Sequence, residues 1–123
     1  MEDLHQDVSA MRVYSLLIET ARRCGVVTYG EIADAAGEKE GGARFASLIG
    51  RLFYRINAVE HAAGRPMLSS LVVSKRPDKR AKSSKKGLCA CARALGLLRA
   101  NASQEALDKF IAEQQRLVYE TWA

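Results

Sequence analysis

The apolar residues in the middle of the chain repeat with helical spacing over some fifteen positions. From Phe45 to Val59 they recur every three or four residues, which places them along one face of a helix. Pro66 disfavours helical backbone at the residue before it, so we expect this helix to end before Arg65. The apolar positions of this predicted helix are Phe45, Leu48, Ile49, Leu52, Phe53, Ile56 and Val59.

The N-terminal third predicts two more helices, one long and one short. Helical spacing of apolar residues runs from Val8 to Arg23, and Gly25 is suited to end that helix. The sequence Thr28-Tyr-Gly-Glu31 is a capping box, in which the two side chains satisfy each other's backbone amides. It predicts a short helix over 29–36, followed by a polar, glycine-bearing turn at 39–42.

After the central helix, the sequence predicts a strand, then a basic loop and then two further helices. Residues 68–74 are short, apolar and rich in valine, which predicts a strand. Residues 75–86 are basic and contain Ala81 as their single apolar residue, so we expect a flexible loop. Helical spacing then returns twice, over Leu88–Arg99 and from Asn101 or Ser103 to about Trp122.

This order of elements predicts a mainly α fold with a small β element. Three helices followed by a strand and a basic loop are typical of a winged helix-turn-helix-like domain, here with two additional C-terminal helices. The short helix would support the central one, and the strand and loop would form the wing. The chain has 123 residues, no internal repeat and no dividing linker, so we expect one domain over 1–123.

Charge is concentrated in the basic segment, which we define as residues 75–86. This segment carries a charge of +6, whereas the whole chain carries +5, so the remainder is close to neutral. Such a run can be a solvated segment, but it is also suited to the phosphates of a nucleic acid, which it would contact without reading sequence. Its cationic residues are Lys75, Arg76, Lys79, Arg80, Lys82, Lys85 and Lys86.

A second group of polar residues follows the face of the central helix opposite its apolar stripe. Arginine forks on a helix can bind guanine edges or phosphates in a DNA groove. The alternative is a solvated face whose arginines pair with Glu40 or Glu60. The predicted nucleic-acid-binding residues of this face are Arg44, Ser47, Arg51 and Arg55.

Other chemistry finds less support in the sequence. Glu60, His61 and Arg65 come close together and could form an acid–base site, although such a trio at the end of a helix more often serves capping and ion pairing. Three cysteines cannot all form internal disulfides, and they lack metal-binding spacing, so we expect reduced thiols and no metal. The sequence contains no phosphate-binding or dinucleotide-binding motif, which predicts no cofactor and no enzyme activity.

The ends of the chain bear on location and assembly. The sequence has no apolar run long enough to span a bilayer, and its acidic N-terminus does not resemble a targeting signal, so we expect a cytoplasmic protein that does not bind membranes. Tyr119 and Trp122 extend the apolar stripe of the last helix, which we expect to pack on the first helix. The alternative for this stripe is a homodimer interface.

The stretch Val26-Val-Thr-Tyr-Gly-Glu-Ile-Ala33 resembles the helix-turn-helix of alkylguanine-DNA alkyltransferases and alkyltransferase-like proteins. The resemblance implies a helix-turn-helix whose following helix lies against the DNA minor groove. It does not extend to the Pro-Cys-His-Arg active-site motif, where this chain has Arg65-Pro-Met-Leu-Ser-Ser-Leu71. We therefore carry over the DNA-binding element without the alkyl-transfer chemistry.

A larger part of the chain resembles a widespread group of small bacterial proteins without an established activity. The similar stretches are Tyr29-Gly-Glu-Ile-Ala33, Ile56-Asn to Glu60-His61, Gly64-Arg-Pro-Met-Leu-Ser-Ser-Leu-Val-Val73 and the C-terminal Val118-Tyr to Trp122. This resemblance implies a shared fold. Members of that group continue into a Pro-Gly-x-Gly-Phe-Phe loop, where this chain has the basic segment and then Gly87-Leu-Cys89.

These observations lead to two hypotheses of different classes. The first is a non-catalytic regulator that binds double-stranded DNA through the arginine-bearing helix and the basic segment. The second is a protein-interaction module, such as a small inhibitor or regulator carried by a mobile element, that binds an acidic protein surface with the same segment. An enzyme built on Glu60, His61 and Arg65 is the third and weakest interpretation.

Overall fold

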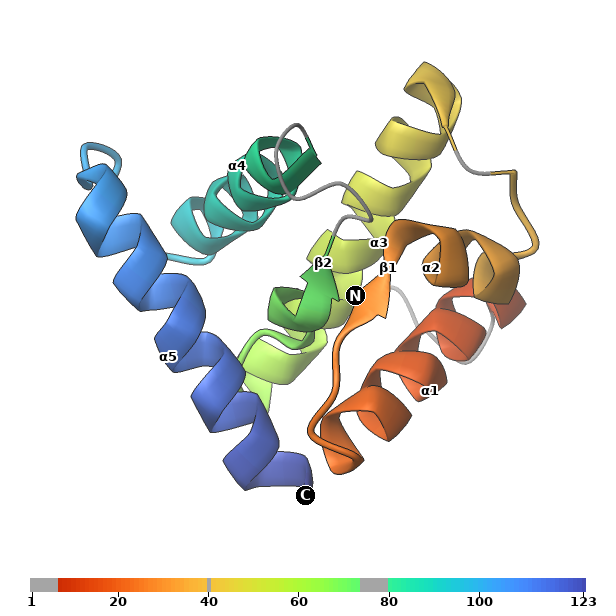
Figure 1. The fold of residues 1–123 in the computed structure, drawn as a ribbon, viewed down its shortest axis with the longest axis horizontal. Coiled ribbons are helices and arrows are strands. Elements are labelled where there is room, and N and C mark those ends of the chain that lie inside the picture. Colours follow the sequence, from red (N-terminus) through yellow and green to blue (C-terminus); the bar gives the residue numbers. More distant parts are fainter. Residues whose placement is uncertain (1–6, 40, 74–79) are drawn as a thin grey trace.

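The computed structural model describes residues 7–39, 41–73 and 80–123, with the backbone alone for 80–86. The chain is mainly α-helical with a small two-stranded parallel sheet, as the sequence predicts. Its elements in chain order (Figure 1) are α1 (Val8–Arg22), β1 (Val27–Thr28), α2 (Tyr29–Ala36), α3 (Gly42–Ala62), the 3-10 helix η2 (Leu68–Leu71), β2 (Val72–Val73), α4 (Arg80–Ala94) and α5 (Gln104–Trp122).

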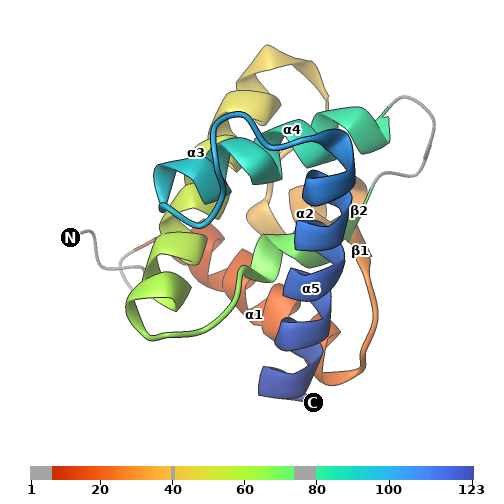
Figure 2. The same ribbon diagram turned by 90° about the vertical axis from the view of Figure 1, so that its left-hand side faces the viewer.

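The helices surround a short central segment formed by η2 and β2. In Figure 1, α1 and α2 lie on one side of this segment and α4 and α5 on the other, and Figure 2 shows α5 passing in front of it. Helix η2 contacts α1, α3 and α5. Strand β2 pairs with β1 in parallel, with Val27 opposite Val72 and Thr28 opposite Val73. The sheet therefore ties the link between α1 and α2 to the segment after α3.

Local sequence signals determine where the first three helices begin. Asp7 caps α1 by accepting a hydrogen bond from the amide of Ala10 at 3.0 Å. Both reciprocal bonds of the predicted capping box are present at the start of α2, between Thr28 and Glu31. Gly41 and Gly42 have φ angles of 102° and 82°, a left-handed conformation that favours glycine. This turn fixes the point at which α3 starts.

The main hydrophobic core is built from the inward faces of these helices and from the central segment. The buried faces match the apolar spacing in the sequence, because residues three and four apart share one side of a helix. A smaller cluster forms where Met67 meets Leu88 and Ala92 of α4. The largest fully buried apolar residues of the main core include Val13, Leu17, Val27, Ile32, Ile56, Leu68, Leu71 and Val118.

The predicted strand over 68–74 is only partly correct. Residues Leu68–Leu71 form a 3-10 helix, Val72–Val73 pair as a strand, and Ser74 lies outside the described residues. Met67 and all of η2 are buried, so their backbone groups need partners within the protein. Side chains of α3 and α5 supply several of these partners, which a composition-based prediction of a strand does not anticipate.

The predicted boundary between the basic loop and the next helix is wrong. Helix α4 begins at Arg80, so residues 80–86 belong to a helix and not to a loop. Arginine, lysine and alanine are strong helix formers, and their lack of core-forming side chains does not prevent a helix. The same helix ends at Ala94, earlier than the predicted Arg99, where Gly96 with φ 77° provides a left-handed terminus. Lys75, Arg76 and Lys79 lie outside the described residues.

Candidate nucleic-acid interface

The N-terminal half of α3 carries an exposed polar face. Phe45 and Ile49 turn inward and are buried, whereas Arg44, Ser47 and Arg51 are exposed. These three residues follow one another at intervals of three and four, so they share one side of the helix. Figures 1 and 2 both show this end of α3 extending beyond the other helices. The predicted face therefore exists as an accessible surface.

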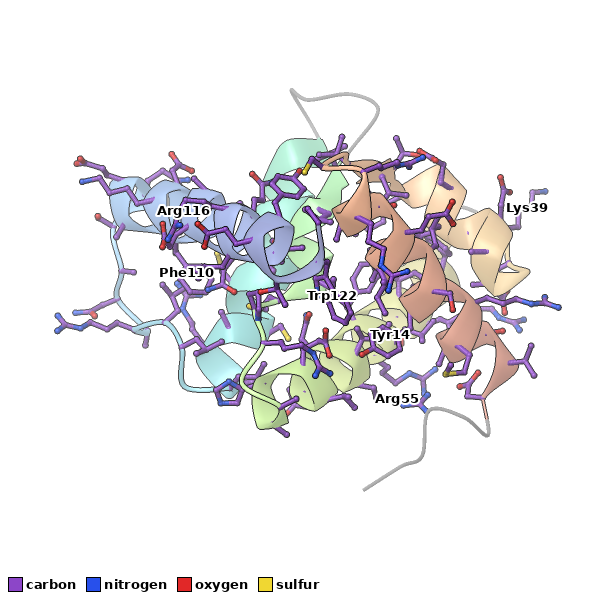
Figure 3. The ribbon with its side chains drawn as sticks, turned by 90° about the horizontal axis from the view of Figure 1, so that it is seen from below. Tyr14, Lys39, Arg55, Phe110, Arg116 and Trp122 are labelled. Atoms are coloured by element: carbon purple, nitrogen blue, oxygen red, sulfur yellow. The ribbon has the colours of Figure 1, made fainter. Side chains whose placement is uncertain are left out.

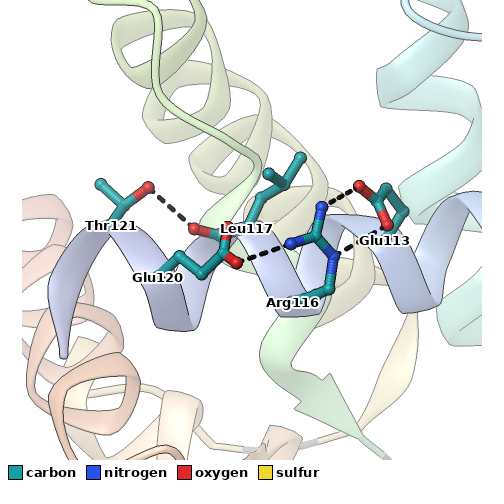
Figure 4. A network of polar contacts seen from close by, with 5 residues as sticks. All are labelled: Glu113, Arg116, Leu117, Glu120 and Thr121. Carbon is teal, nitrogen blue, oxygen red and sulfur yellow. Dashed lines mark hydrogen bonds and ion pairs between the residues drawn. The ribbon is translucent and has the colours of Figure 1, made fainter.

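Arg44 and Arg51 differ from several other arginines because neither forms an ion pair within the described residues. On α5, by contrast, Arg116 binds Glu113 and Glu120 on either side of it, at 2.6 Å for Glu120 (Figure 4). The hydrogen bonds that Arg116 donates to Glu113 raise the pKa of Arg116. Within the described residues the charges of Arg44 and Arg51 are thus unmatched, while that of Arg116 is matched by two carboxylates. Of the two partners considered for this face, Glu60 binds Arg65, and Glu40 lies outside the described residues.

Arg55, the fourth residue of the predicted set, has a different environment. Its Nη1 donates to the Asp7 carboxylate at 2.8 Å, and its side chain is only 23% exposed. The backbone hydrogen bond from Ala10 and the bond from Arg55 lower the pKa of Asp7. Arg55 therefore joins α3 to the N-cap of α1, and the structure does not bring it together with the three exposed residues as a free cation.

Tyr54 belongs to the exposed face of α3, although the sequence interpretation did not include it. It follows Arg51 by three residues, and 44% of its surface is exposed. Its phenol ring can pack on a sugar or donate a hydrogen bond to a phosphate. The signal in the sequence was its helical spacing from Arg44 and Arg51.

The basic segment begins directly after β2 and continues into α4. Helix α4 packs beside α3, where Asn57 Nδ2 donates to Cys91 Sγ at 3.4 Å. The described backbone thus connects the two predicted binding elements through one packed unit. The side chains of Arg80, Lys82, Lys85 and Lys86 lie outside the described residues, as do Lys75, Arg76 and Lys79 entirely.

Glu60 and Arg65 form an ion pair between α1, α3 and the C-terminus, in which the carboxylate is buried and the Arg65 side chain is 33% exposed. The Glu60 side chain is fully buried, and its Oε2 accepts from Arg65 at 2.6 Å and 3.0 Å and from the Tyr14 hydroxyl at 2.8 Å. The Arg65 guanidinium lies 5.5 Å from the centre of the Trp122 ring. Figure 3 shows Tyr14 and Trp122 facing the same region of the interior. The hydrogen bond to Glu60 raises the pKa of Arg65.

His61 is separate from this cluster. It is exposed, and in the part of the chain with described side chains no hydrogen bond joins it to Glu60 or Arg65. The geometry thus brings together two of the three residues considered for acid–base chemistry. With its carboxylate held by Arg65 and Tyr14, Glu60 is placed to stabilise the fold.

The free energy of unfolding should fall as the pH rises above about 10. Burial raises the pKa of Tyr14, and its hydrogen bond to Glu60 raises it further. The folded state then holds this proton more tightly than the unfolded state, so the stabilisation is complete below the unfolded pKa and is lost through the folded one. Urea unfolding at several alkaline pH values measures how steeply the free energy of unfolding falls with pH.

The Tyr14→Phe variant should lose part of this alkaline slope. Some slope will remain, because burial also raises the pKa of Tyr119. A Tyr14→Phe protein whose stability falls as steeply as that of the unsubstituted protein would contradict this assignment.

The aromatic residues at the end of α5 pack within the chain. The Tyr119 hydroxyl donates to the backbone oxygen of Gly25 at 2.8 Å, and Trp122 packs against the main core. This arrangement agrees with the predicted contact between the last helix and the first. Cys24 is an exposed free thiol, Cys91 is a partly buried one, and Cys89 is buried.

Comparisons with known proteins leave the family open. None of the family models, curated proteins or solved structures that were compared matches this chain. The two resemblances drawn from the sequence therefore stay predictions. Among the described residues, no helix combines the length and the apolar character needed to cross a membrane.

Proposed function

We propose that this protein is a non-catalytic regulator that binds double-stranded DNA through α3 and the basic segment. The observation that carries the proposal is the exposed face of α3, where Arg44 and Arg51 flank Ser47 without an ion pair among the described residues. Arginine presents several donors in a rigid fork and binds phosphates and guanine edges in pairs of hydrogen bonds.

The proposal includes a winged helix-turn-helix-like use of the fold. Helix α2 would support α3, and α3 would enter a groove with its projecting end. The basic segment would contact phosphates, and its charge of +6 would supply most of the affinity without reading the sequence. Because part of this segment is helical, the lysines after Arg80 would approach DNA from α4 and not from a hairpin wing.

The first test measures the anisotropy of a labelled DNA duplex at several salt concentrations. We expect affinity to fall steeply with salt, because each neutralised phosphate contributes about 0.9 to the slope of log K against log salt. The variant Lys82→Gln/Lys85→Gln/Lys86→Gln should reduce this slope by about 2 to 3. Glutamine is a good helix former, so these changes preserve α4 while removing its charge.

The second test asks whether the arginines of the α3 face bind DNA specifically or only through the overall positive charge of the protein. The variant Arg44→Gln/Arg51→Gln should weaken binding roughly tenfold or more, because each good arginine contact is worth about 1–3 kcal/mol. The matched control, Arg23→Gln/Arg99→Gln, removes the same charge at exposed positions elsewhere and should change the affinity far less.

Three results would contradict the proposal: no duplex binding at low salt, equal effects of the α3 variant and its control, or a salt slope unaffected by the lysine changes. Absence of DNA binding together with lysine-dependent, stoichiometric capture of an acidic protein would favour the interaction module instead.

A further inference from the structure

A groove lies on the outer side of α1, in a part of the molecule that the proposed DNA contacts do not use. It has a volume of about 650 Å³ and is lined by α1 and by the end of α2. In Figure 1, α1 and α2 lie on the side of the molecule opposite α4 and α5. The lining residues are Val8, Met11, Arg12, Ser15, Leu16, Glu19, Asp34 and Ala35.

The groove combines apolar surface with unmatched charges of both signs. Val8 is 63% exposed, the largest exposure among the large apolar residues of the described chain. Arg12, Glu19 and Asp34 are exposed, and within the described residues none of them forms an ion pair. A partner that covers this groove would bury the exposed apolar side chains and match the charges beside them.

The order of charges along α1 indicates what this other protein is. Arg12 and Glu19 are seven residues apart, about two helical turns, so they lie on the same side of α1. If a second α1 runs antiparallel across a two-fold axis between Ser15 and Leu16, Arg12 of each copy faces Glu19 of the other. A two-fold interface must be complementary to itself, and this surface meets that condition.

The end of α2 adds a second complementary contact. Ser9 Oγ donates to the backbone oxygen of Ala36 at 2.9 Å, which holds the end of α2 beside the start of α1. In the antiparallel pair, the exposed Arg22 at the end of one α1 approaches the start of the other. It is thereby brought towards Asp34 of the second copy, which adds an opposite-charge contact to those between Arg12 and Glu19.

We propose that the α1–α2 groove is a homodimer interface occupied by the same groove of a second copy. This inference does not rest on DNA binding. One helix pair and the flanking end of α2 bury less than the standard interface of about 1,600 Å², so we expect a reversible dimer. The dimer contact uses the outer side of α1 and α2, which faces away from the core. It therefore leaves the projecting face of α3 accessible in both copies.

Sedimentation equilibrium of the full chain over a wide range of concentration tests the dimer directly. The variants Arg12→Glu and Glu19→Arg each replace two attractive contacts by two repulsive ones, and each should raise the dimer Kd roughly tenfold or more. Arg99→Glu, an exposed reversal on the far side of the molecule, should leave the Kd unchanged. Circular dichroism checks that every variant is folded.

The decisive measurement uses the two single variants together. Each variant alone repels itself, but an equimolar mixture restores both opposite-charge contacts and should form a heterodimer near the original affinity. The double variant Arg12→Glu/Glu19→Arg should likewise recover the homodimer. A chain that stays monomeric at all concentrations, or a dimer that neither reversal weakens or that mixing does not restore, would overturn the inference.

Discussion

Replacing Arg65 by methionine should lower the free energy of unfolding by about 3 kcal/mol, the lower end of the cost of removing one partner from a buried ion pair, because the Arg65 side chain is 33% exposed. The carboxylate of Glu60 is fully buried, and Arg65 donates two of its hydrogen bonds. Its Oε1 has no partner among the described residues, so only Tyr14 would still bind the charge. The penalty thus arises from the charge that remains, more than from the contact that is lost.

A double variant distinguishes this cause from a simple loss of packing. Glu60→Gln/Arg65→Met removes both charges and should be more stable than Arg65→Met alone, since two neutral side chains carry no uncompensated charge. If the loss came only from the stacking of Arg65 on Trp122, the second substitution would bring no recovery. Both variants are measured by urea unfolding.

Trp122 adds a fluorescence signal from the surroundings of the ion pair to the measurement of overall unfolding. It is the only tryptophan of the chain and stacks on Arg65, so its fluorescence reports on the surroundings of the pair. Arg116 provides the matched control, because its ion pairs with Glu113 and Glu120 are exposed. Arg116→Met should change stability little. A similar loss in both variants would show that burial of the pair is not the cause.

The sequence predicts the helices well because their signals are local. The capping box at Thr28 and Glu31 lies within four residues, and the apolar spacing of α3 is read within a single helix. The same spacing places Arg44, Ser47 and Arg51 on the exposed face. Periodicity is therefore sufficient to predict that these three residues are accessible.

The parts that were missed depend on contacts between distant residues. Arg55 has the right spacing for the α3 face, but Asp7, its partner, is 48 positions away. Likewise, the 3-10 helix at Leu68–Leu71 is fastened by α5, through Gln115 Nε2, which donates to the backbone oxygen of Ser70 at 2.8 Å. Neither pairing leaves a pattern in the neighbouring sequence. The start of α4 differs from the prediction for another reason, since a segment without apolar residues can still be helical where its residues are strong helix formers.

Substituting Asn57 by alanine should destabilise the protein by about 2–3 kcal/mol, because it leaves buried polar groups without partners. Asn57 is fully buried, and its Nδ2 donates to Ser69 Oγ at 2.8 Å. Its Oδ1 accepts from the amide of Ser69 at 3.4 Å, and its Nδ2 also reaches Cys91. One side chain of α3 thus joins the central segment to α4.

A double-mutant cycle with Ser69 tests whether the cost comes from these unmatched groups. In Asn57→Ala/Ser69→Ala the serine hydroxyl is absent, so the double variant should lose less stability than the sum of the single variants. Gln115→Ala is the control, since this residue binds Ser70 from a partly exposed position and should cost less than Asn57→Ala. Additive losses for Asn57 and Ser69 would mean that the hydrogen bonds between them do not hold the central segment. Apolar packing and the hydrogen bonds with Gln114 and Gln115 of α5 would then have to hold this segment among the helices.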